Sequence, residues 1–302
     1  MDNSLENKKI IVTGGNGYLG SFLVKSLSDK GADVYIISID ADSDDHNFPI
    51  DITRFDELNT VVQQIQPDIV YHLAASISRN RDFNIFENML KVNVTGTYNL
   101  LKSLEKTECE QFIFTSTSEI YGNNSSPFHE ELLPMPVSPY SVTKVMAENL
   151  IKTYCQNHHR NYTILRLFNF FGENMSEDFF ISQMVNSLKS GQDFLMTKGE
   201  QTRDFIYIAD VITALILVAE KADAYNETFN VCSGIGSSLE SIASFINQKT
   251  GSSASIKLGA LPYRKNEVWE MIGSAAKIKE KLGFVPGYNL HEGLELVINR
   301  NE

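Results

Sequence analysis

The sequence predicts an α/β fold built on a doubly wound parallel sheet. Three observations carry this prediction. Short, almost wholly apolar runs alternate over the first half of the chain with longer stretches whose apolar residues recur at helical spacing. Strands that are apolar on both faces are typical of a parallel sheet covered by helices on both sides. A glycine-rich turn directly follows the first apolar run and leads into a helical stretch.

The expected elements follow one another in order. The first strand, 9–13, runs into the glycine turn and then into a helix marked by Phe22, Leu23 and Leu27. β-Branched and aromatic runs predict further strands at 34–39, 69–73, 112–116 and 162–167. Helical spacing predicts helices between them at 55–65, 88–104 and 138–158. We therefore expect residues 1–165 to form the first domain.

Beyond residue 166 the alternation fades into a loop-rich tract with scattered glycines, where helices are still predicted at 180–189, 210–221 and 239–250. We expect residues 166–302 to form mainly a smaller, irregular C-terminal lobe, with parts of 205–232 returning to the first domain. No linker rich in Gly, Ser or Pro separates the two parts, so we expect them to pack as one unit.

The composition excludes several classes of protein. With 42% hydrophobic and 21% charged residues, the 302-residue chain has ordinary globular usage and can bury a core without disulfides or metals. Its 26 Lys and Arg against 38 Asp and Glu give a net charge of −12. Such a surface repels nucleic acid and anionic lipid, so we expect neither nucleic acid nor membrane as a partner. No apolar stretch approaches the roughly 20 residues of a membrane span.

Cysteine usage and the first residues predict a cytoplasmic location. The 3 cysteines, Cys109, Cys155 and Cys232, are odd in number, far apart and without metal-ligand spacing. The sequence from Met1 lacks the basic segment and apolar core of a signal peptide. We expect a reducing compartment in which the thiols are small core residues, and no metal.

The glycine turn has the pattern of a dinucleotide site. Gly14, Gly17 and Gly20 are spaced three apart between a strand and a helix. This spacing permits a tight turn, a close approach of the backbone to a pyrophosphate, and close packing of helix on strand. The flanking strand, helix and second strand all fit, so the motif predicts a bound dinucleotide.

The choice between NAD and NADP depends on the end of the second strand, where an acidic residue would grip the adenosine ribose. Ser38 occupies the usual position, and Asp40 lies two residues further on the same side of a strand. No Arg or Lys occurs between Lys30 and Arg54 to neutralise a 2′-phosphate. This favours NAD over NADP, although Asp40 also belongs to a generally acidic loop.

Tyr140 and Lys144 form a candidate proton-transfer pair. They lie four residues apart behind Ser138 and Pro139, a favourable helix start, so both share one face near the positive end of the helix. A helix N-terminus and a neighbouring ammonium are expected to lower the pKa of a phenol. Tyr140 is therefore a candidate acid or base for an alcohol or sugar oxygen.

Several tracts, spread in order over nearly the whole chain, together form a recognisable pattern. They are Thr13 to Gly20, Tyr71 to Ala75, Asn93 to Thr97, Phe114 to Gly122, Tyr140 to Lys144, Arg166 to Asn169, Arg203 to Phe205, Phe229 to Gly234 and Arg264 to Glu267. In these tracts the chain resembles one family, the extended short-chain dehydrogenase/reductases that act on nucleotide sugars. The resemblance implies a Rossmann-like fold with a C-terminal substrate-binding lobe.

The resemblance implies roles residue by residue. Thr117 matches the residue that hydrogen-bonds the reacting oxygen, Tyr140 the acid/base, and Lys144 the residue that holds the nicotinamide ribose. The cofactor-binding set comprises Gly14, Gly17, Tyr18, Leu19, Gly20, Asp40, Asp51, Ile52, Ala74, Ala75 and Lys144. Asn93 matches a structural asparagine behind the cofactor. The substrate-binding set comprises Thr117, Ser118, Glu119, Asn169, Arg203 and Arg264. Arginine suits a diphosphate through its planar fork, but Arg203 beside Asp204 is also compatible with a surface ion pair.

Three reactions share this constellation: 4-keto reduction, 4-epimerisation through a bound keto intermediate, and 4,6-dehydration. Family dehydratases carry Asp where this chain has Ser118, which disfavours dehydration, while Glu119 remains as an auxiliary acid or a supporting residue. The late tracts resemble GDP-4-keto-6-deoxymannose reductases most, so we expect a reductase acting on a nucleotide-diphosphate sugar. A UDP-glucose 4-epimerase type with tightly bound NAD is the alternative, and a non-catalytic cofactor-binding protein a remote one.

The helices at 88–104 and 138–158 resemble the family's dimer interface, which predicts a homodimer.

Overall fold

The computed structural model describes residues 4–78, 81–264 and 267–299. Lys265 and Asn266, part of the tract that resembles the family's substrate-binding region, lie outside the described residues, as do residues 1–3. The described helices include none that is both long and apolar enough to span a membrane.

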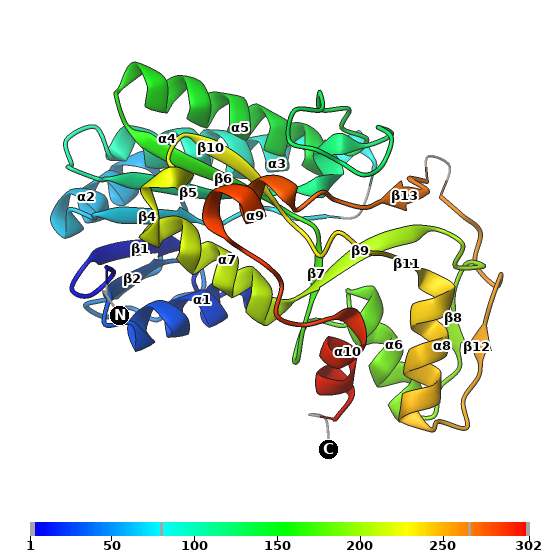
Figure 1. Ribbon diagram of the computed structural model, residues 1–302. Helices are drawn as coiled ribbons and strands as arrows, with labels where there is room; N and C mark the ends of the chain where they lie inside the picture. Colours follow the sequence, from blue (N-terminus) through cyan, green and yellow to red (C-terminus); the bar gives the residue numbers. More distant parts are fainter. Residues whose placement is uncertain (1–3, 79–80, 265–266, 300–302) are drawn as a thin grey trace.

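A seven-stranded parallel sheet forms the larger part of the molecule (Figure 1). Its order, β10-β6-β5-β4-β1-β2-β3, runs outward in both directions from β1 and β4, so the predicted doubly wound, Rossmann-like sheet is confirmed. The strands are β1 (Lys9–Thr13), β2 (Asp33–Ile37), β3 (Asn47–Phe48), β4 (Ile69–His72), β5 (Gln111–Thr117), β6 (Asn161–Leu167) and β10 (Glu227–Val231).

Helices cover both faces of this sheet, as the apolar strands require. Ile11 and Phe112 pack under α2 (Phe55–Ile65), α4 (Gly96–Ser103) and α5 (Pro139–Asn157). On the other face Val12 and Ile113 pack against α1 (Tyr18–Asp29) and α7 (Ile208–Glu220). Successive strand residues point to opposite faces, and both faces are buried here. Cys109 and Cys155 are free and buried in the first of these cores, and Cys232 is free and buried in a separate cluster with Tyr121 and Phe168, as predicted.

Most predicted bounds agree with the structure to within one or two residues, and two elements differ in a way that has a structural reason. The second strand ends at Ile37 and not at 39, because the chain turns where the Ser38 hydroxyl donates to Asp40 and the Ala41 N–H donates to the Ser38 carbonyl. The helix predicted at 88–104 is divided into α3 (Phe86–Leu90), a π-helical turn (Lys91–Thr95) and α4. Periodicity alone does not reveal a π-turn, which adds one residue to a single helical turn.

Beyond β6 the chain adds short strands that the sequence does not reveal. In the smaller sheet β9 (Thr202–Tyr207) lies beside β11 (Gly236–Ser238), β13 (Glu270–Met271) and β7 (Asn169–Phe171). A further pair joins β8 (Phe194–Leu195) to β12 (Ile256–Lys257). The helices here are α6 (Phe180–Lys189), α8 (Leu239–Thr250), α9 (Ala276–Leu282) and α10 (Leu290–Asn299), whereas α7 and β10 belong to the large sheet and its cover.

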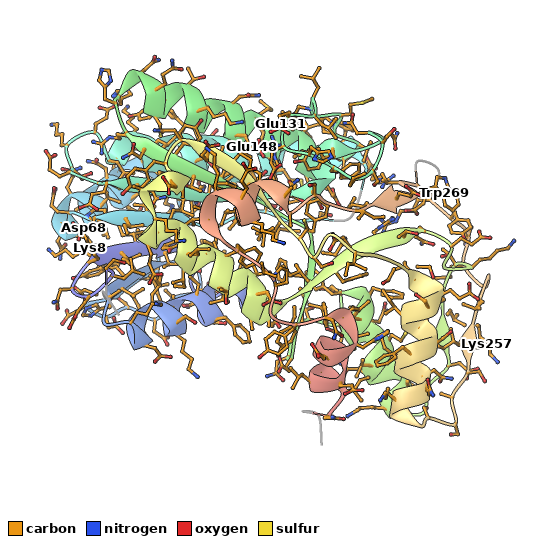
Figure 2. The ribbon with its side chains drawn as sticks, in the orientation of Figure 1. Lys8, Asp68, Glu131, Glu148, Lys257 and Trp269 are labelled. Carbon is orange, nitrogen blue, oxygen red and sulfur yellow. The ribbon has the colours of Figure 1, made fainter. Side chains whose placement is uncertain are left out.

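The two ends of the large sheet have different surroundings. Lys8 and Asp68, which precede β1 and β4, mark its amino edge, and the Lys9 N–H donates to Asp68 at 2.8 Å (Figure 2). The carboxyl ends of the strands face the other way, toward β9 and β13. Trp269, which precedes β13, marks that side of the molecule in the same view. In doubly wound sheets this carboxyl edge is where ligands bind.

Candidate active site

A single long cleft of about 1140 Å³ lies along the carboxyl edge of the large sheet and continues beneath the smaller sheet. Its lining comes from the loops after β1, β2, β4 and β5, from the first turn of α5, and from β7 to β9. The structure brings together in this cleft every residue of the predicted cofactor and substrate sets: Gly14, Gly17, Tyr18, Leu19, Gly20, Asp40, Asp51, Ile52, Ala74, Ala75, Thr117, Ser118, Glu119, Tyr140, Lys144, Asn169, Arg203 and Arg264.

The glycine loop is shaped for close approach of a ligand. Gly14 has a φ of +71°, and a Cβ placed there would lie 2.9 Å from the Ala74 nitrogen. A Cβ at Gly20 would collide with the Gly14 carbonyl. Gly17 is the N-cap of α1 and supplies no capping side chain, so the first N–H groups of the helix remain for an external acceptor. These residues fit the pyrophosphate of a dinucleotide.

The end of the cleft beyond β2 is framed by acidic residues. Asp40 is exposed beyond β2, and its backbone carbonyl accepts from the Asn16 side chain at 3.1 Å, which fixes this turn against the glycine loop. Asp51 accepts from the Thr53 N–H at 2.9 Å, and Ile52 is buried with its carbonyl bonded to Asn99 at 3.1 Å. The structure therefore places a carboxylate beside an apolar wall at this end.

The first turn of α5 is fixed by its cap. The Ser138 hydroxyl accepts from the Ser141 N–H at 3.1 Å, and Ser141 Oγ accepts from the Ser138 N–H at 3.0 Å, which forms a reciprocal capping box. Ser138 Oγ also donates to Glu119 Oε2 at 2.9 Å. Glu119 thus ties the end of β5 to the start of α5, and this turn presents Tyr140 and Lys144 to the cleft.

The electrostatics of the pair differ from the sequence expectation. Burial and the nearby Glu119 carboxylate raise the pKa of Tyr140, where we expected the helix and Lys144 to lower it. Burial also lowers the pKa of Lys144, to about 7. Its ammonium charge is therefore only partly present at neutral pH, and the effect of desolvation on the pKa of Tyr140 exceeds that of the ammonium. Lys144 Nζ lies 4.1 Å from the centre of the Phe114 ring. At neutral pH Tyr140 is therefore a protonated phenol that can donate its proton.

Thr117 is the last residue of β5, and its hydroxyl can accept one hydrogen bond and donate another. Its Oγ1 accepts from the Glu119 N–H at 3.2 Å, which caps the short 3₁₀ turn Ser118–Tyr121. That bond uses the oxygen lone pair and leaves the hydroxyl proton free to donate into the cleft. The neighbouring Ser118 hydroxyl instead contacts the Met271 sulfur at 3.3 Å.

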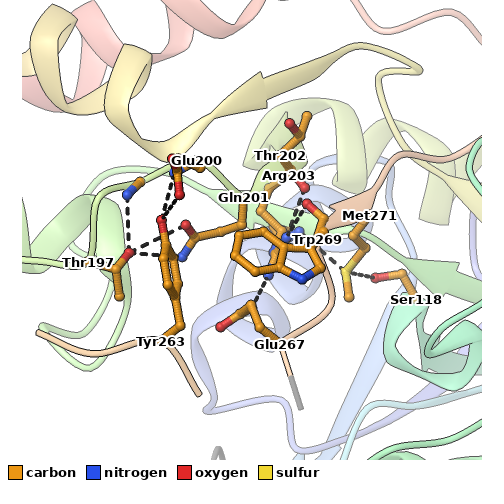
Figure 3. Close-up of polar contacts among 12 residues, drawn as sticks. Ser118, Thr197, Glu200, Gln201, Thr202, Arg203, Tyr263, Glu267, Trp269 and Met271 are labelled. Carbon is orange, nitrogen blue, oxygen red and sulfur yellow. Dashed lines mark hydrogen bonds and ion pairs between the residues drawn. The ribbon is translucent and has the colours of Figure 1, made fainter. Parts of the chain in front are cut away.

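The far end of the cleft carries guanidinium groups. Arg203 pairs with Glu267 at 2.7 Å and donates to the Thr202 carbonyl at 2.9 Å (Figure 3). The alternative of an Arg203–Asp204 surface pair is wrong, because Asp204 is buried and accepts instead from Ser233, Gly234 and Gly273. Asn169 donates to the Asp204 carbonyl at 3.3 Å.

Two cleft residues were missed by sequence reasoning. Arg81 lines the cleft, and the charges of Arg81 and Arg264 add to burial in lowering the pKa of Arg203. Glu267 ends the tract Arg264 to Glu267, which carries part of the family resemblance, but the resemblance did not assign it to the site. Arg81 lies in the loop after β4, where the sequence has no hydrophobic periodicity that would mark it. Only the folded chain shows that it lies at the same end of the cleft as Arg203 and Arg264.

Comparison with known proteins agrees with this geometry. Residues 10–232 match the model of the NAD dependent epimerase/dehydratase family. A GDP-6-deoxy-D-talose 4-dehydrogenase of Aggregatibacter actinomycetemcomitans is 29% identical over 282 residues, which cover 91% of each chain. Among solved structures, a UDP-glucose 4-epimerase of Thermotoga maritima with UDP-glucose superimposes with a TM-score of 0.90 at 28% identity, covering 96% of this chain and 97% of that one. MoeE5 in complex with UDP-glucuronic acid and NAD gives a TM-score of 0.89 at 27% identity, with 97% and 98% covered.

Proposed function

The chain belongs to the NAD dependent epimerase/dehydratase family and is an NAD-dependent enzyme of the extended short-chain dehydrogenase/reductase type; within it, we propose that the chain reduces the 4-keto group of a nucleotide-activated sugar. The observation that carries the proposal is the trio in the cleft, where Thr117 ends β5 and Tyr140 and Lys144 open α5. The protonated state of Tyr140 is the one that a reduction needs.

In the proposed reaction each side chain has one task. The residues of the glycine loop and Lys144 would hold NAD, which in its reduced form would supply the hydride for C4. Tyr140 donates its phenolic proton to the carbonyl oxygen, so that the ketone becomes an alcohol. Thr117 donates a hydrogen bond to the same oxygen and holds it in line with Tyr140. Lys144, which is buried with its Nζ 6.0 Å from the centre of the Tyr140 ring, would bind the nicotinamide ribose.

The substrate is proposed to lie toward the smaller sheet. Arg203 and Arg264 would hold the two phosphates, because a protein with a net charge of −12 needs local guanidinium groups to bind a dianion. The 29% identical relative is named as a 4-dehydrogenase of a GDP-sugar, and dehydrogenation at C4 run backward is reduction of a 4-keto sugar. This relative supports the reductase. Mass spectrometry of the small molecules that co-purify with the chain would identify the nucleotide of the substrate.

A 4-epimerase with tightly bound NAD is the second candidate. It is favoured by the similarity to the Thermotoga maritima 4-epimerase and by the loop after β2, which carries no Arg or Lys between Lys30 and Arg54. An epimerase oxidises and then reduces the same carbon, so it recycles its NAD and needs no NADPH supply.

A test that distinguishes the two reactions is to incubate the purified protein with a 4-keto nucleotide sugar and NADH. A reductase consumes NADH in proportion to product, whereas an epimerase interconverts C4 epimers with no net change at the nicotinamide absorbance band. Tyr140→Phe removes the donated proton but keeps the ring, so turnover should fall by roughly 10² to 10⁴ while NAD still binds. Tyr154→Phe, which removes a hydroxyl bonded to Glu105 elsewhere on α5, is the matched control and should retain turnover. Full activity of Tyr140→Phe would refute the mechanism.

Three further features are part of the proposal. Residues 1–165, with α7 and β10 from 205–232, would form the dinucleotide-binding domain, and the rest of 166–302 the substrate-binding lobe. A homodimer is supported by the exposed Tyr98 on α4 and Met146 on α5, which are 41% and 39% exposed. A reducing, cytoplasmic location is supported by the three free, buried thiols.

A further inference from the structure

Five polar side chains are buried together between the glycine loop and the start of α5. Thr13, His72, Asn93, Thr97 and Thr143 are each 2% exposed or less. They come from β1, β4, the π-turn, α4 and α5, and the cleft lining contains none of them. Because burying a polar group costs free energy unless it is hydrogen-bonded, apolar side chains would fill this space more simply.

The first half of the group is an ordered series of hydrogen bonds. The Ala74 N–H donates to Thr13 Oγ1 at 3.2 Å, and Thr13 Oγ1 lies 2.7 Å from His72 Nδ1. His72 Nε2 lies 2.9 Å from Thr97 Oγ1, whose proton goes to the Asn93 carbonyl at 2.6 Å. Since Thr97 has one proton and has given it away, His72 must donate through Nε2 and accept at Nδ1.

The second half continues to the catalytic turn. Asn93 Nδ2 donates to Thr143 Oγ1 at 3.0 Å, and the Thr143 hydroxyl donates to the Tyr140 carbonyl at 2.8 Å. Within each half the protons point one way, from the Ala74 N–H to the Asn93 backbone carbonyl and from the Asn93 side-chain amide to the Tyr140 carbonyl, and the two halves are joined through the residue Asn93 itself. Burial and the charge of Lys144 lower the pKa of His72 to about 3, so the ring stays neutral and keeps this direction. Hydrogen bonds ordered in this way strengthen one another in a low-dielectric interior.

We propose that His72 and Thr97 are positioning residues, which couple the occupancy of the glycine loop to the placement of the first turn of α5 and so to the Tyr140 hydroxyl. The inference rests on the role of Tyr140 in the proposed function, but the coupling itself needs no substrate. A ligand that presses on Ala74 and the glycine loop is transmitted through the series to Tyr140. The Tyr140 hydroxyl would therefore reach its position for proton donation only when the cofactor is bound.

A single hydroxyl cuts the series. Thr97→Val replaces the hydroxyl by a methyl group of similar size and leaves His72 Nε2 without its acceptor, while Thr97→Ser restores it. Thr143→Val is a milder second cut, because Asn93 Nδ2 also donates to the Ser76 carbonyl at 3.0 Å. The matched control is Thr107→Val, because the Thr107 hydroxyl is buried and bonded to a carbonyl three residues earlier, as in Thr143, but lies outside the series.

The readout is amide hydrogen exchange with ADP as the probe. ADP fills the adenosine and phosphate end of the NAD site but has no nicotinamide ribose, so it cannot touch Tyr140 or Lys144 directly. In the unmodified protein ADP should slow exchange both in the glycine loop and at residues 140–144. Thr97→Val and Thr143→Val should keep the first effect and lose the second, whereas Thr97→Ser and Thr107→Val should keep both.

Turnover gives an independent readout. In Thr97→Val, kcat should fall about tenfold or more while KM stays within about twofold, because a small misplacement of the acid affects the chemical step and not binding. Thr97→Ser should recover most of kcat. The inference is overturned if ADP protects residues 140–144 equally in Thr97→Val, or protects neither segment in the unmodified protein. A wrong choice of reaction would appear only in the substrate assay and would leave the exchange result standing.

Discussion

Among single residues, Lys144 is a cationic side chain buried in the first turns of α5. It was identified from its spacing to Tyr140, and the structure adds that it is 2% exposed and packed over Phe114. Spacing on a helix predicts which residues share a face, but not how deeply a neighbouring strand buries them. For this reason the predicted direction of the Tyr140 pKa was wrong while the position of the pair in the cleft was predictable.

The buried lysine predicts a pH dependence of stability. Because the pKa of Lys144 falls from 10.5 to about 7 on folding, the unfolded chain binds more protons between these pH values, and this group makes stability rise with pH through that window. Lys144→Met removes the effect. Its melting temperature relative to the unmodified protein should therefore be most favourable below pH 7 and lose that advantage toward pH 10. Lys25→Met, on the exposed face of α1, controls for charge, and a difference independent of pH would contradict the prediction.

Gly17 makes a second prediction at this scale. Its φ of −67° is accessible to any residue, so a substitution there tests space alone. A Cβ would lie 3.2 Å from the Gly14 carbonyl, in the mouth of the phosphate site. Gly17→Val should abolish NAD binding in calorimetry, and Gly17→Ala should weaken it to an intermediate degree. Unaltered affinity of Gly17→Val would refute the placement of the pyrophosphate.

At the scale of elements, long amphipathic segments were predictable and short ones were not. The predicted bounds of α2, α6 and α8 match the structure, because each carries a full apolar face. The strands β8, β12 and β13 have two residues each and depend on partners distant in sequence. The substrate end of the cleft is built from such strands and loops, which is why Arg81 and Glu267 were not identified in advance.

A buried ion pair adds to the apolar packing of α5 on the sheet. Glu148 on α5 (Figure 2) bonds Arg166 on β6 through both oxygens, at 3.1 and 2.9 Å, with side chains 3% and 4% exposed. Arg166 also donates to the Tyr121 hydroxyl at 2.8 Å and to the Glu130 carbonyl at 2.9 Å. The pair therefore joins the catalytic helix, β6 and the segment after β5.

Breaking this pair should be costly. Arg166→Met leaves the buried Glu148 carboxylate with only the Ser116 hydroxyl at 2.5 Å and the Lys152 ammonium at 3.8 Å, and should lower the free energy of unfolding by about 3 kcal/mol in urea denaturation. Adding Glu148→Gln to that variant removes the uncompensated charge and should recover part of the loss. Arg54→Met, which breaks an exposed pair with Glu57, should change stability by no more than about 0.5 kcal/mol. An equally small effect of Arg166→Met would contradict the assignment.

At the scale of the whole molecule, the two sides of the large sheet are unequally covered. The face under α1 and α7 is continuous with the core of α6, α8 and α10. In the described part of the chain, the opposite face is covered by α2, α4, α5 and the π-helical turn before α4 (Figure 1). On that side lie large apolar side chains, including Tyr98, Met146 and, just before α3, Phe83. Burial of such side chains is the main source of stability in a subunit interface.

The homodimer proposed from this face makes the last prediction. Light scattering at micromolar concentration should give a mass near twice the 33.9 kDa of one chain. In a two-fold dimer each substitution acts twice, so Met146→Lys, which places two ammonium groups in the interface, should shift the mass toward one chain. Leu133→Lys adds the same charge at a side chain that is 81% exposed on the segment after β5 and should leave the mass unchanged. A mass near 34 kDa for the unmodified protein would exclude the dimer, and a shift caused equally by Leu133→Lys would move the interface away from α4 and α5.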